Sequence, residues 1–250
     1  MSAPAPRRRR RRRAIAWVLG SIGGLIAVAA VALVVYSQVG VMGAETGPWE
    51  AVRANPAIAV DDTGTAVVLS PASGGDGAGL VFIPGAKVAA EAYAAKLSGA
   101  VTDDGLTVVI TKPWLNLAFF DPRPLSTFTD LAPAVQRWAV GGHSLGGVRA
   151  CQLATDADAL VLFASYCAND LSASGLPVLS ISGSEDGLST PQKIADAAHD
   201  LPADARLVEI PGASHASFGD YGPQPGDGTP TISDADMTAD LTAALADVFG

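Results

Sequence analysis

A run of 23 residues without a charged side chain, from Ala14 to Tyr36, constrains this chain more than any other feature. At about 1.5 Å per residue, an α-helix of that length reaches about 34 Å, enough to cross the roughly 30 Å hydrocarbon core of a bilayer. Trp17 and Tyr36 stand near its two ends, where amphipathic rings favour the membrane interface. The run therefore predicts a transmembrane helix over residues 14–36.

Seven consecutive arginines, residues 7–13, precede this apolar run. Because basic flanks stay on the cytoplasmic side, we expect an Arg-rich cytoplasmic segment over residues 1–13 and the rest of the chain outside the cytoplasm, in a single-pass protein of the cell membrane. A cleaved signal peptide is an alternative, although its apolar region is typically only about 7–15 residues long. A twin-arginine signal also remains open, and every route leaves the body of the chain outside the cytoplasm.

The net charge of −9 is unevenly distributed. Of 16 basic residues, seven lie in residues 7–13, so the remainder carries 9 basic against 25 acidic groups, or −16. An acidic body repels phosphates, and we expect no nucleic-acid partner. The two cysteines, Cys151 and Cys167, suit an oxidising compartment; a disulfide and a pair of buried thiols both remain open, because a sequence does not supply the geometry that decides between them.

Short β-type runs alternate with helical stretches from residue 57 onward, after a linker containing Gly and Pro that is expected over residues 37–56. Such alternation predicts an α/β domain over residues 57–250, with a doubly wound, mostly parallel sheet whose ligands bind at the carboxyl ends of its strands. Strands are expected over residues 57–60, 65–69, 80–83, 106–110, 138–141, 159–164, 178–182 and 206–210. Helices are expected over residues 89–97, 127–137, 145–154, 190–199 and 233–249.

One motif between an apolar strand and a helix has the form expected of a nucleophile. Residues 142–146 read Gly-His-Ser-Leu-Gly and match G-x-S-x-G. A serine on a strained turn needs neighbours without Cβ atoms, so that strand and helix approach closely and the hydroxyl projects outward. An ordinary glycine-rich turn has the same composition, but the strand-turn-helix context favours Ser144 as a catalytic nucleophile.

A serine hydroxyl is a weak nucleophile and needs a base, for which the chain offers three histidines. His143 adjoins the nucleophile and should point away from it, while His199 is expected to be a solvated residue near a helix end. His215 follows the last expected strand and is the remaining candidate. The chain order Ser, acid, His then favours Asp186 as the third member, with Glu185 as its nearest rival.

Acyl transfer also needs N–H donors for an oxyanion, and the chain offers two places for them. The backbone N–H of Leu145 directly follows the nucleophile. The second donor should come from the loop after residues 80–83, where Pro84 has no N–H to give and Ala86 is preferred to Gly85.

Three segments together resemble the α/β-hydrolase superfamily, and within it the small dienelactone-hydrolase-like group known as alpha/beta hydrolase family 5. They are residues 141–147 (Gly-Gly-His-Ser-Leu-Gly-Gly), 82–88 (Phe-Ile-Pro-Gly-Ala-Lys-Val) and 214–222 (Ser-His-Ala-Ser-Phe-Gly-Asp-Tyr-Gly). The resemblance covers about residues 60–250. It implies hydrolysis of ester or related acyl bonds with no metal ion or organic cofactor, and the short stretch between Ala164 and Val178 leaves no room for a large lid.

These features predict a membrane-anchored serine hydrolase, carboxylesterase-like, acting on a small ester or acyl substrate through a Ser144–His215–Asp186 triad and an acyl-enzyme. A catalytically silent binding protein on the same fold is an alternative, as is an acyltransferase using the same triad. Four residues either line a substrate pocket or belong to the hydrophobic core, and composition does not decide between these two roles. They are Tyr93, Trp114, Asn116 and Phe120. Asp220 and Tyr221 either support the histidine loop or have no link to it.

Overall fold

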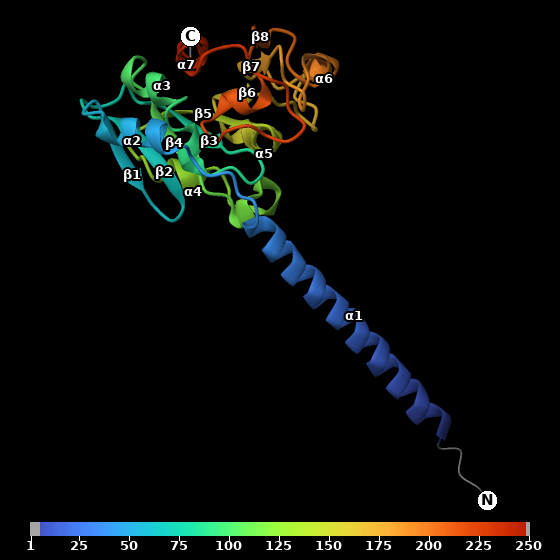
Figure 1. The fold of residues 1–250 in the computed structure, drawn as a ribbon. Coiled ribbons are helices and arrows are strands. Elements are labelled where there is room, and N and C mark those ends of the chain that lie inside the picture. The colour runs from blue at the N-terminus through green and yellow to red at the C-terminus, as the bar shows by residue number, and fades with distance from the viewer. Residues whose placement is uncertain (1–5, 249–250) are drawn as a thin grey trace, which may run out of the picture. The chain divides into compact units, whose positions relative to one another are not determined.

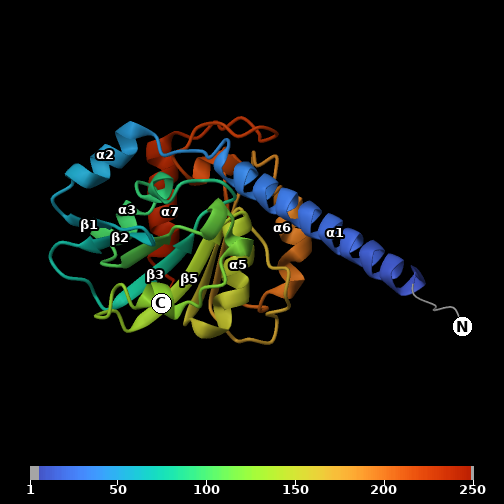
Figure 2. The same ribbon diagram turned by 90° about the horizontal axis from the view of Figure 1, so that it is seen from below.

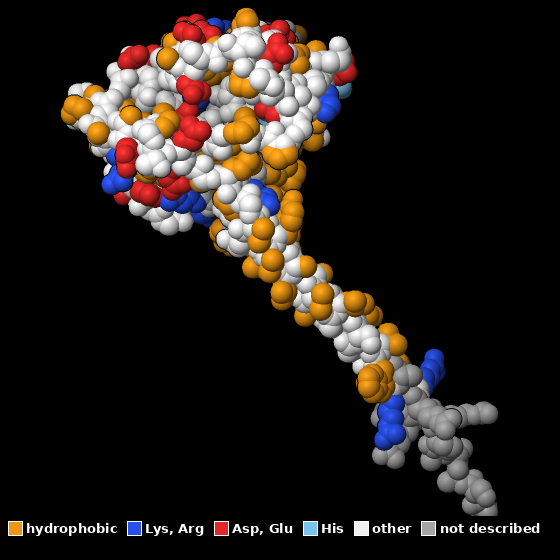
Figure 3. Space-filling model, in the orientation of Figure 1, with side chains coloured by type: hydrophobic (Ala, Val, Ile, Leu, Met, Phe, Trp, Pro, Cys, Tyr) orange, Lys and Arg blue, Asp and Glu red, His pale blue; other side chains and the backbone are white. Residues whose placement is uncertain are grey.

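The structure, a computed structural model, describes residues 6–248 and forms two compact units, residues 1–40 and 41–250. The first unit contains one long helix, α1 (Pro6–Gln38). Its segment Ile15–Gln38 is 24 residues long, and the most apolar 18-residue stretch within it has a mean hydropathy of 2.6 and no buried residue. Apolar side chains are therefore exposed along the helix (Figure 3). By length and composition this helix is able to span a membrane.

The second unit, called the body below, carries eight strands among its described residues (Figure 1). The strands are β1 (Ile58–Asp62), β2 (Ala66–Pro71), β3 (Ala78–Ile83), β4 (Thr107–Thr111), β5 (Arg137–His143), β6 (Ala159–Phe163), β7 (Val178–Gly183) and β8 (Arg206–Ile210). The α-helices are α2 (Thr46–Ala54), α3 (Ser98–Thr102), α4 (Ser126–Thr129), α5 (Leu145–Leu153), α6 (Pro191–Ala197) and α7 (Asp234–Leu245). The short 3₁₀ turns are η1 (Ala90–Tyr93), η2 (Trp114–Asn116), η3 (Ala118–Phe120), η4 (Ala154–Asp156), η5 (Ala198–Asp200) and η6 (His215–Phe218).

All eight strands join one sheet in the order β1-β2-β4-β3-β5-β6-β7-β8. The hairpin β1–β2 is antiparallel and β2 pairs antiparallel with β4, whereas every pair from β4 to β8 is parallel. The expected mostly parallel α/β sheet is thus confirmed. Because the six strands from β4 to β8 run in one direction, their carboxyl ends meet along a single edge, which we call the carboxyl edge.

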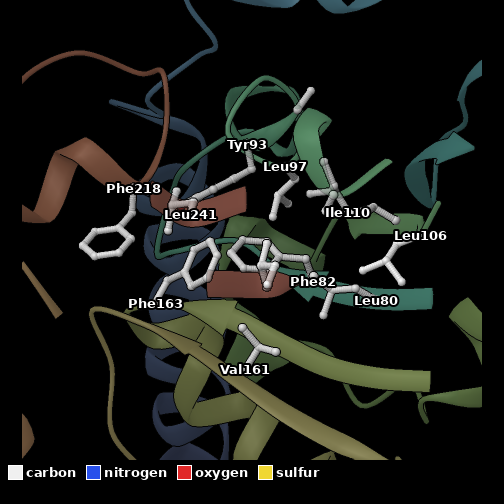
Figure 4. Packing of buried hydrophobic residues seen from close by; sticks show 14 of the residues in the cluster. Leu80, Phe82, Tyr93, Leu97, Leu106, Ile110, Val161, Phe163, Phe218 and Leu241 are labelled. Atoms are coloured by element: carbon white, nitrogen blue, oxygen red, sulfur yellow. The ribbon is translucent and has the colours of Figure 1, made fainter. Parts of the chain in front are cut away.

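The central strands β3, β4, β6 and β7 are buried along their whole length, as expected for continuous apolar strands that are covered on both faces. Side chains of β3 alternate between the faces: Leu80 and Phe82 pack in a cluster that includes residues of α3 and α7, whereas Val81 and Ile83 pack with residues of α4 and α5. Figure 2 shows β3 and β5 between these two helical layers, and Figure 4 shows the first cluster, where Phe82 lies beside Phe163 and Tyr93.

Two expected helices are wrong. The stretch 89–97 forms only the 3₁₀ turn η1, and the α-helix that follows begins at Ser98. The stretch 127–137 is helical only to Thr129, because Pro133 has no N–H and disfavours a helical conformation of the residue before it.

The segment expected as a linker, residues 37–56, contains structured chain that belongs to the body. Thr46–Ala54 forms α2, whose Val52 is buried in the core. Met42 forms a β-bridge with Val88. The body of the molecule therefore begins earlier than residue 57.

The two cysteines form a disulfide, with 5.5 Å between the Cα atoms of Cys151 and Cys167. The bond links α5 to the loop that follows β6, so it ties together two segments next to the Ser144 turn.

Candidate active site

Ser144 occupies the turn between β5 and α5, at the carboxyl edge of the sheet. Its backbone has φ 52° and ψ −122°, a conformation that non-glycine residues rarely adopt. The turn is held from both sides: the Ser144 N–H donates to the Phe163 carbonyl at 3.0 Å, and the Ser165 hydroxyl donates to the Ser144 carbonyl at 2.7 Å. Such held strain is typical of a nucleophile presented at the end of a strand.

The glycines around Ser144 are required by close backbone contacts. A Cβ atom on Gly142 would lie 2.5 Å from the carbonyl carbon of Gly146, and one on Gly146 would lie 2.0 Å from the Ile83 carbonyl oxygen. Strand, turn and helix therefore meet at backbone distance, and the first turn of α5 packs directly against the end of β3. This contact places the Ser144 turn beside the loop that follows β3, residues 84–88, which we call the oxyanion loop.

Asp186 and His215 form a buried pair. His215 Nδ1 lies 2.8 Å from Asp186 Oδ2, and the two side chains are 1% and 0% exposed. The other Asp186 oxygen accepts the N–H groups of Leu188 and Ser189, each at 2.7 Å. Asp186 lies in the turn after β7 (the acid turn, residues 183–189) and His215 in the loop after β8 (the His loop, residues 211–222), so both lie at the carboxyl edge.

The two other residues considered for these positions lie elsewhere. Glu185 is exposed, and its carboxylate accepts only the Ser184 hydroxyl at 3.3 Å among the described residues. His199 has a side chain that is 76% exposed, as expected for a solvated residue.

The structure brings His215 close to the Ser144 turn through His143. The rings of His143 and His215 lie 4.4 Å apart between centroids, and His143 directly precedes Ser144. Asp186 and His215 are joined by a direct hydrogen bond, whereas within residues 6–248 no hydrogen bond joins the Ser144 hydroxyl to His215. In enzymes without bound substrate, such nucleophile–base contacts are often long and shorten when substrate binds.

His143 is fully buried and joins the Ser144 turn to the oxyanion loop. Its Nδ1 lies 2.9 Å from the Tyr93 hydroxyl oxygen, which accepts the Gly85 N–H at 3.0 Å. Burial, together with the neighbouring charge of His215, lowers the pKa of His143 well below its usual value. Burial also raises the pKa of Tyr93. Both side chains are therefore neutral near pH 7.

The hydrogen bond of Gly85 separates the two candidates for the second oxyanion donor. Gly85 gives its N–H to Tyr93, whereas no described residue accepts the N–H of Ala86. The N–H of Leu145, the first residue of α5, is likewise without an acceptor among residues 6–248, as expected at a helix N-terminus. Two free N–H groups thus lie on adjoining segments, one on each side of the contact between Gly146 and Ile83.

Asp227 is a site-related residue that the sequence analysis missed. Its Oδ1 accepts the N–H groups of His215 at 3.0 Å and Gly187 at 3.1 Å, and its Oδ2 accepts that of Ala216 at 2.8 Å. Burial alone would raise the pKa of Asp227, but these N–H donors outweigh it and hold the pKa below its usual value. One carboxylate thereby ties the acid turn to the His loop. The only feature of the sequence that could have pointed to Asp227 is its place in a loop rich in Pro and Gly, 12 residues after His215.

Asp220 and Tyr221 are part of the His loop and fix it to its surroundings. The Tyr221 hydroxyl donates to the His215 carbonyl at 3.5 Å, and Asp220 forms a buried ion pair with Lys96 at 2.8 Å. Burial raises the pKa of Asp220, while the Lys96 charge opposes that rise. Both residues support the loop that carries His215.

The aromatic candidates for a pocket divide into two groups. Tyr93 is a core residue with no exposed surface, while Trp114 and Phe120 are 54% and 45% exposed at the carboxyl edge. A cavity of about 230 Å³ is lined in part by the His loop, and Asp220 and Asp227 are among its lining residues. Ser144 does not line it. In the part of the chain that the structure describes, no group of three or more His, Cys, Asp and Glu side chains is placed to hold a metal ion.

Comparisons with known proteins agree with this architecture. The family model described as "Alpha/beta hydrolase family" matches residues 79–239. The esterase domain of a Rhodothermus marinus protein superposes with a TM-score of 0.56 at 16% identity, covering 73% of this chain and 90% of that one. A dienelactone hydrolase-like promiscuous phosphotriesterase from metagenomic libraries superposes with a TM-score of 0.52 at 15% identity, covering 78% and 100%. No curated protein sequence matches significantly. At these identities the solved structures establish the fold.

Proposed function

The chain belongs to the α/β-hydrolase family, and from this premise we propose that it is a serine hydrolase that cleaves ester or related acyl bonds through an acyl-enzyme. One observation carries the proposal: the buried Asp186–His215 pair lies beside a strained serine turn at the carboxyl edge of the sheet. Covalent acyl transfer by a serine requires a carboxylate that orients an imidazole, and an imidazole that takes the proton of the hydroxyl.

In the proposed reaction, the Ser144 Oγ attacks the acyl carbonyl carbon while His215 Nε2 takes the hydroxyl proton. Asp186 holds Nδ1 protonated, which leaves Nε2 free to act as the base, and its charge stabilises the imidazolium that forms. The tetrahedral oxyanion accepts hydrogen bonds from the N–H groups of Leu145 and Ala86. His215 then returns its proton to the leaving alcohol, and water releases the acyl group from Ser144 by the same steps.

The test is covalent labelling of the full chain, purified in detergent, with a fluorophosphonate probe, followed by hydrolysis of a series of p-nitrophenyl esters. Labelling and turnover should both vanish in Ser144→Ala. The matched control is Ser172→Ala, an exposed serine whose loss should change neither. A well-folded wild-type chain that neither reacts with the probe nor hydrolyses any ester would refute the enzymatic proposal and favour a binding protein.

We further propose that α1 anchors the chain in the cell membrane as a single-pass helix, with the Arg-rich end in the cytoplasm and the body outside. The length and hydropathy of Ile15–Gln38 and the seven arginines before it support this topology. Resistance to alkaline carbonate extraction would support the anchor. Digestion of the body by protease added to the outside of spheroplasts would support the orientation, and release of the chain by carbonate would refute the anchor.

A further inference from the structure

Exposed apolar side chains gather at the carboxyl edge of the body. Beyond residue 40, the large hydrophobic side chains that are exposed in the described chain are those of Trp114, Phe119, Phe120, Leu131, Tyr166 and Leu207. Four of these six, which we call the edge aromatics, lie in loops that follow the carboxyl ends of β4 and β6: Trp114, Phe119, Phe120 and Tyr166. Gathered exposed apolar side chains mark an interaction surface, whereas scattered ones need no explanation.

The edge aromatics are joined to the candidate active site. The Asn116 carbonyl, between Trp114 and Phe119, accepts the N–H of Lys87 in the oxyanion loop at 2.8 Å. The turn η3, which carries Phe119 and Phe120, packs against α5, the helix that begins directly after Ser144. Tyr166 follows Ser165, whose hydroxyl holds the Ser144 carbonyl. The edge aromatics are therefore attached to the segments that carry Ser144 and the oxyanion loop.

The covalent chain brings this edge close to the proposed anchor. The Met42 N–H donates to the Lys87 carbonyl at 2.7 Å, and the Ala89 N–H donates to the Met42 carbonyl at 2.9 Å, so Met42 is fixed to the end of the oxyanion loop. Only three residues separate Met42 from Gln38, the last residue of the apolar segment. Four residue steps of extended chain reach at most about 14 Å. When the segment spans a bilayer, the oxyanion loop is thus held at the bilayer surface.

We propose that the edge aromatics rest on the surface of the bilayer that α1 crosses, and that the Ser144 site takes its substrate from that surface. The substrate class is an amphiphilic ester, whose acyl chain lies in the lipid and whose carbonyl sits at the level of the polar headgroups. Trp and Tyr rings favour this level of a membrane, and Phe adds buried apolar area. The inference rests on the proposed hydrolase function and on the proposed anchor.

The docking is tested on the full chain reconstituted in phosphatidylcholine vesicles. An environment-sensitive fluorophore is attached at Phe119→Cys, and in a matched control at Leu207→Cys; the two native side chains are 55% and 53% exposed. Leu207 lies near the start of β8, the edge strand at the far end of the sheet from β1. Lipids that carry a quencher just below the headgroup should quench the label at position 119 and leave the label at position 207 nearly unchanged.

Equal quenching at both positions, or none at position 119, would overturn the docking. A chain that does not float with the vesicles would overturn the anchor and the docking together. None of these outcomes depends on catalysis.

The substrate class is tested by the ratio of two activities: hydrolysis of p-nitrophenyl palmitate dissolved in the vesicles, and hydrolysis of p-nitrophenyl acetate in solution. Replacing Trp114, Phe119 and Phe120 together by Ser should lower this ratio about tenfold, because less apolar area contacts the lipid. Leu207→Ser should leave the ratio unchanged. An unchanged ratio in the triple variant would overturn the substrate class. A wild type inactive on both esters would refute the hydrolase function, while the quenching result would still report on the docking.

Discussion

Asp227 offers a direct test of how the His loop is held against the acid turn. Its carboxylate accepts three N–H groups from these two segments, those of His215, Ala216 and Gly187. Gly187 directly follows Asp186, so the bonds fix the backbone on both sides of the Asp186–His215 contact. We predict that Asp227→Asn loosens this contact, and that Asp227→Ala does so more severely.

The magnitude follows from the hydrogen bonds that are lost. A hydrogen bond to a charged group contributes about 1.5–3 kcal/mol net. Asn keeps one carbonyl oxygen for the Oδ1 partners but turns an NH₂ group toward the Ala216 N–H, so one bond is lost and the others lose their charge. Because Asp227 is partly exposed, water replaces some of this loss. We expect the free energy of unfolding to fall by about 1–3 kcal/mol for Asn and about 2–4 kcal/mol for Ala.

Asp227→Asn should also lower the catalytic activity, and the loss should appear in kcat. Misalignment of the base costs transition-state stabilisation, and each 1.36 kcal/mol is a factor of ten, so we expect kcat of Asp227→Asn to fall about 10- to 100-fold. KM should change little, because in the proposed mechanism Asp227 only positions the backbone that carries Asp186 and His215. The assay is hydrolysis of p-nitrophenyl acetate over a range of concentrations, at a temperature where both proteins are folded.

The pH dependence gives an independent check. The N–H donors hold the pKa of Asp227 below its usual value of 3.8, so the carboxylate stabilises the folded state above about pH 4. That contribution is lost as the pH falls through the folded pKa. The difference in stability between wild type and Asp227→Asn should therefore be constant from about pH 5 to 8 and shrink below about pH 4.

The matched control is Glu185→Gln, which removes an exposed carboxylate from the same acid turn. It should change neither the unfolding free energy nor kcat measurably. Two results would contradict the reasoning: equal effects of the two substitutions, or an Asp227→Asn protein with wild-type kcat and wild-type stability.

Three further predictions concern the surroundings of Ser144. Tyr93→Phe leaves one main-chain N–H of the oxyanion loop without its acceptor and should lower the unfolding free energy by about 1–3 kcal/mol in urea titrations, with a lower kcat. Gly146→Ala places a Cβ 2.0 Å from a backbone oxygen and should abolish fluorophosphonate labelling, whereas Gly64→Ala, which meets nothing within 4 Å, should not. Opening the Cys151–Cys167 disulfide, which closes a loop of 16 residues, should lower the stability by about 3 kcal/mol in calorimetry with and without reductant.

The sheet was predictable from the sequence because its strands carry a strong local signal. Buried parallel strands are short, apolar on both faces and bounded by Gly, Pro or polar residues, as residues 80–83 and 159–164 are. The Ser144 turn was equally predictable from the sequence, since the close backbone contacts at positions 142 and 146 leave no room for a Cβ atom and so require glycine. The pairing of Asp186 with His215 was reached from chain order, and their catalytic roles stay a prediction.

The misses have a common physical origin in long-range contacts. Asp227 acts on main-chain N–H groups, which every residue except proline possesses, so its partners leave no trace in the sequence. The stretch 89–97 has the alanine content of a helix, but Asp220 donates its N–H to the Ala92 carbonyl at 2.6 Å and Tyr93 turns inward to meet His143. Tertiary contacts there outweigh helix propensity, which amounts to less than about 1 kcal/mol per residue.

His143 shows how a residue rejected as the catalytic base still has a physical role. Gly85 donates its N–H to the Tyr93 hydroxyl oxygen, and the same hydroxyl is hydrogen-bonded to His143 Nδ1. A protonated His143 would place a second cation 4.4 Å from the His215 ring, between centroids, and oppose the imidazolium that forms there when Ser144 attacks. Burial lowers the pKa of His143 and so keeps its ring uncharged, which removes that repulsion. The oxyanion loop is thus attached to the Ser144 turn by uncharged groups, and the charges within the proposed reaction centre are confined to Asp186 and, during the reaction, His215.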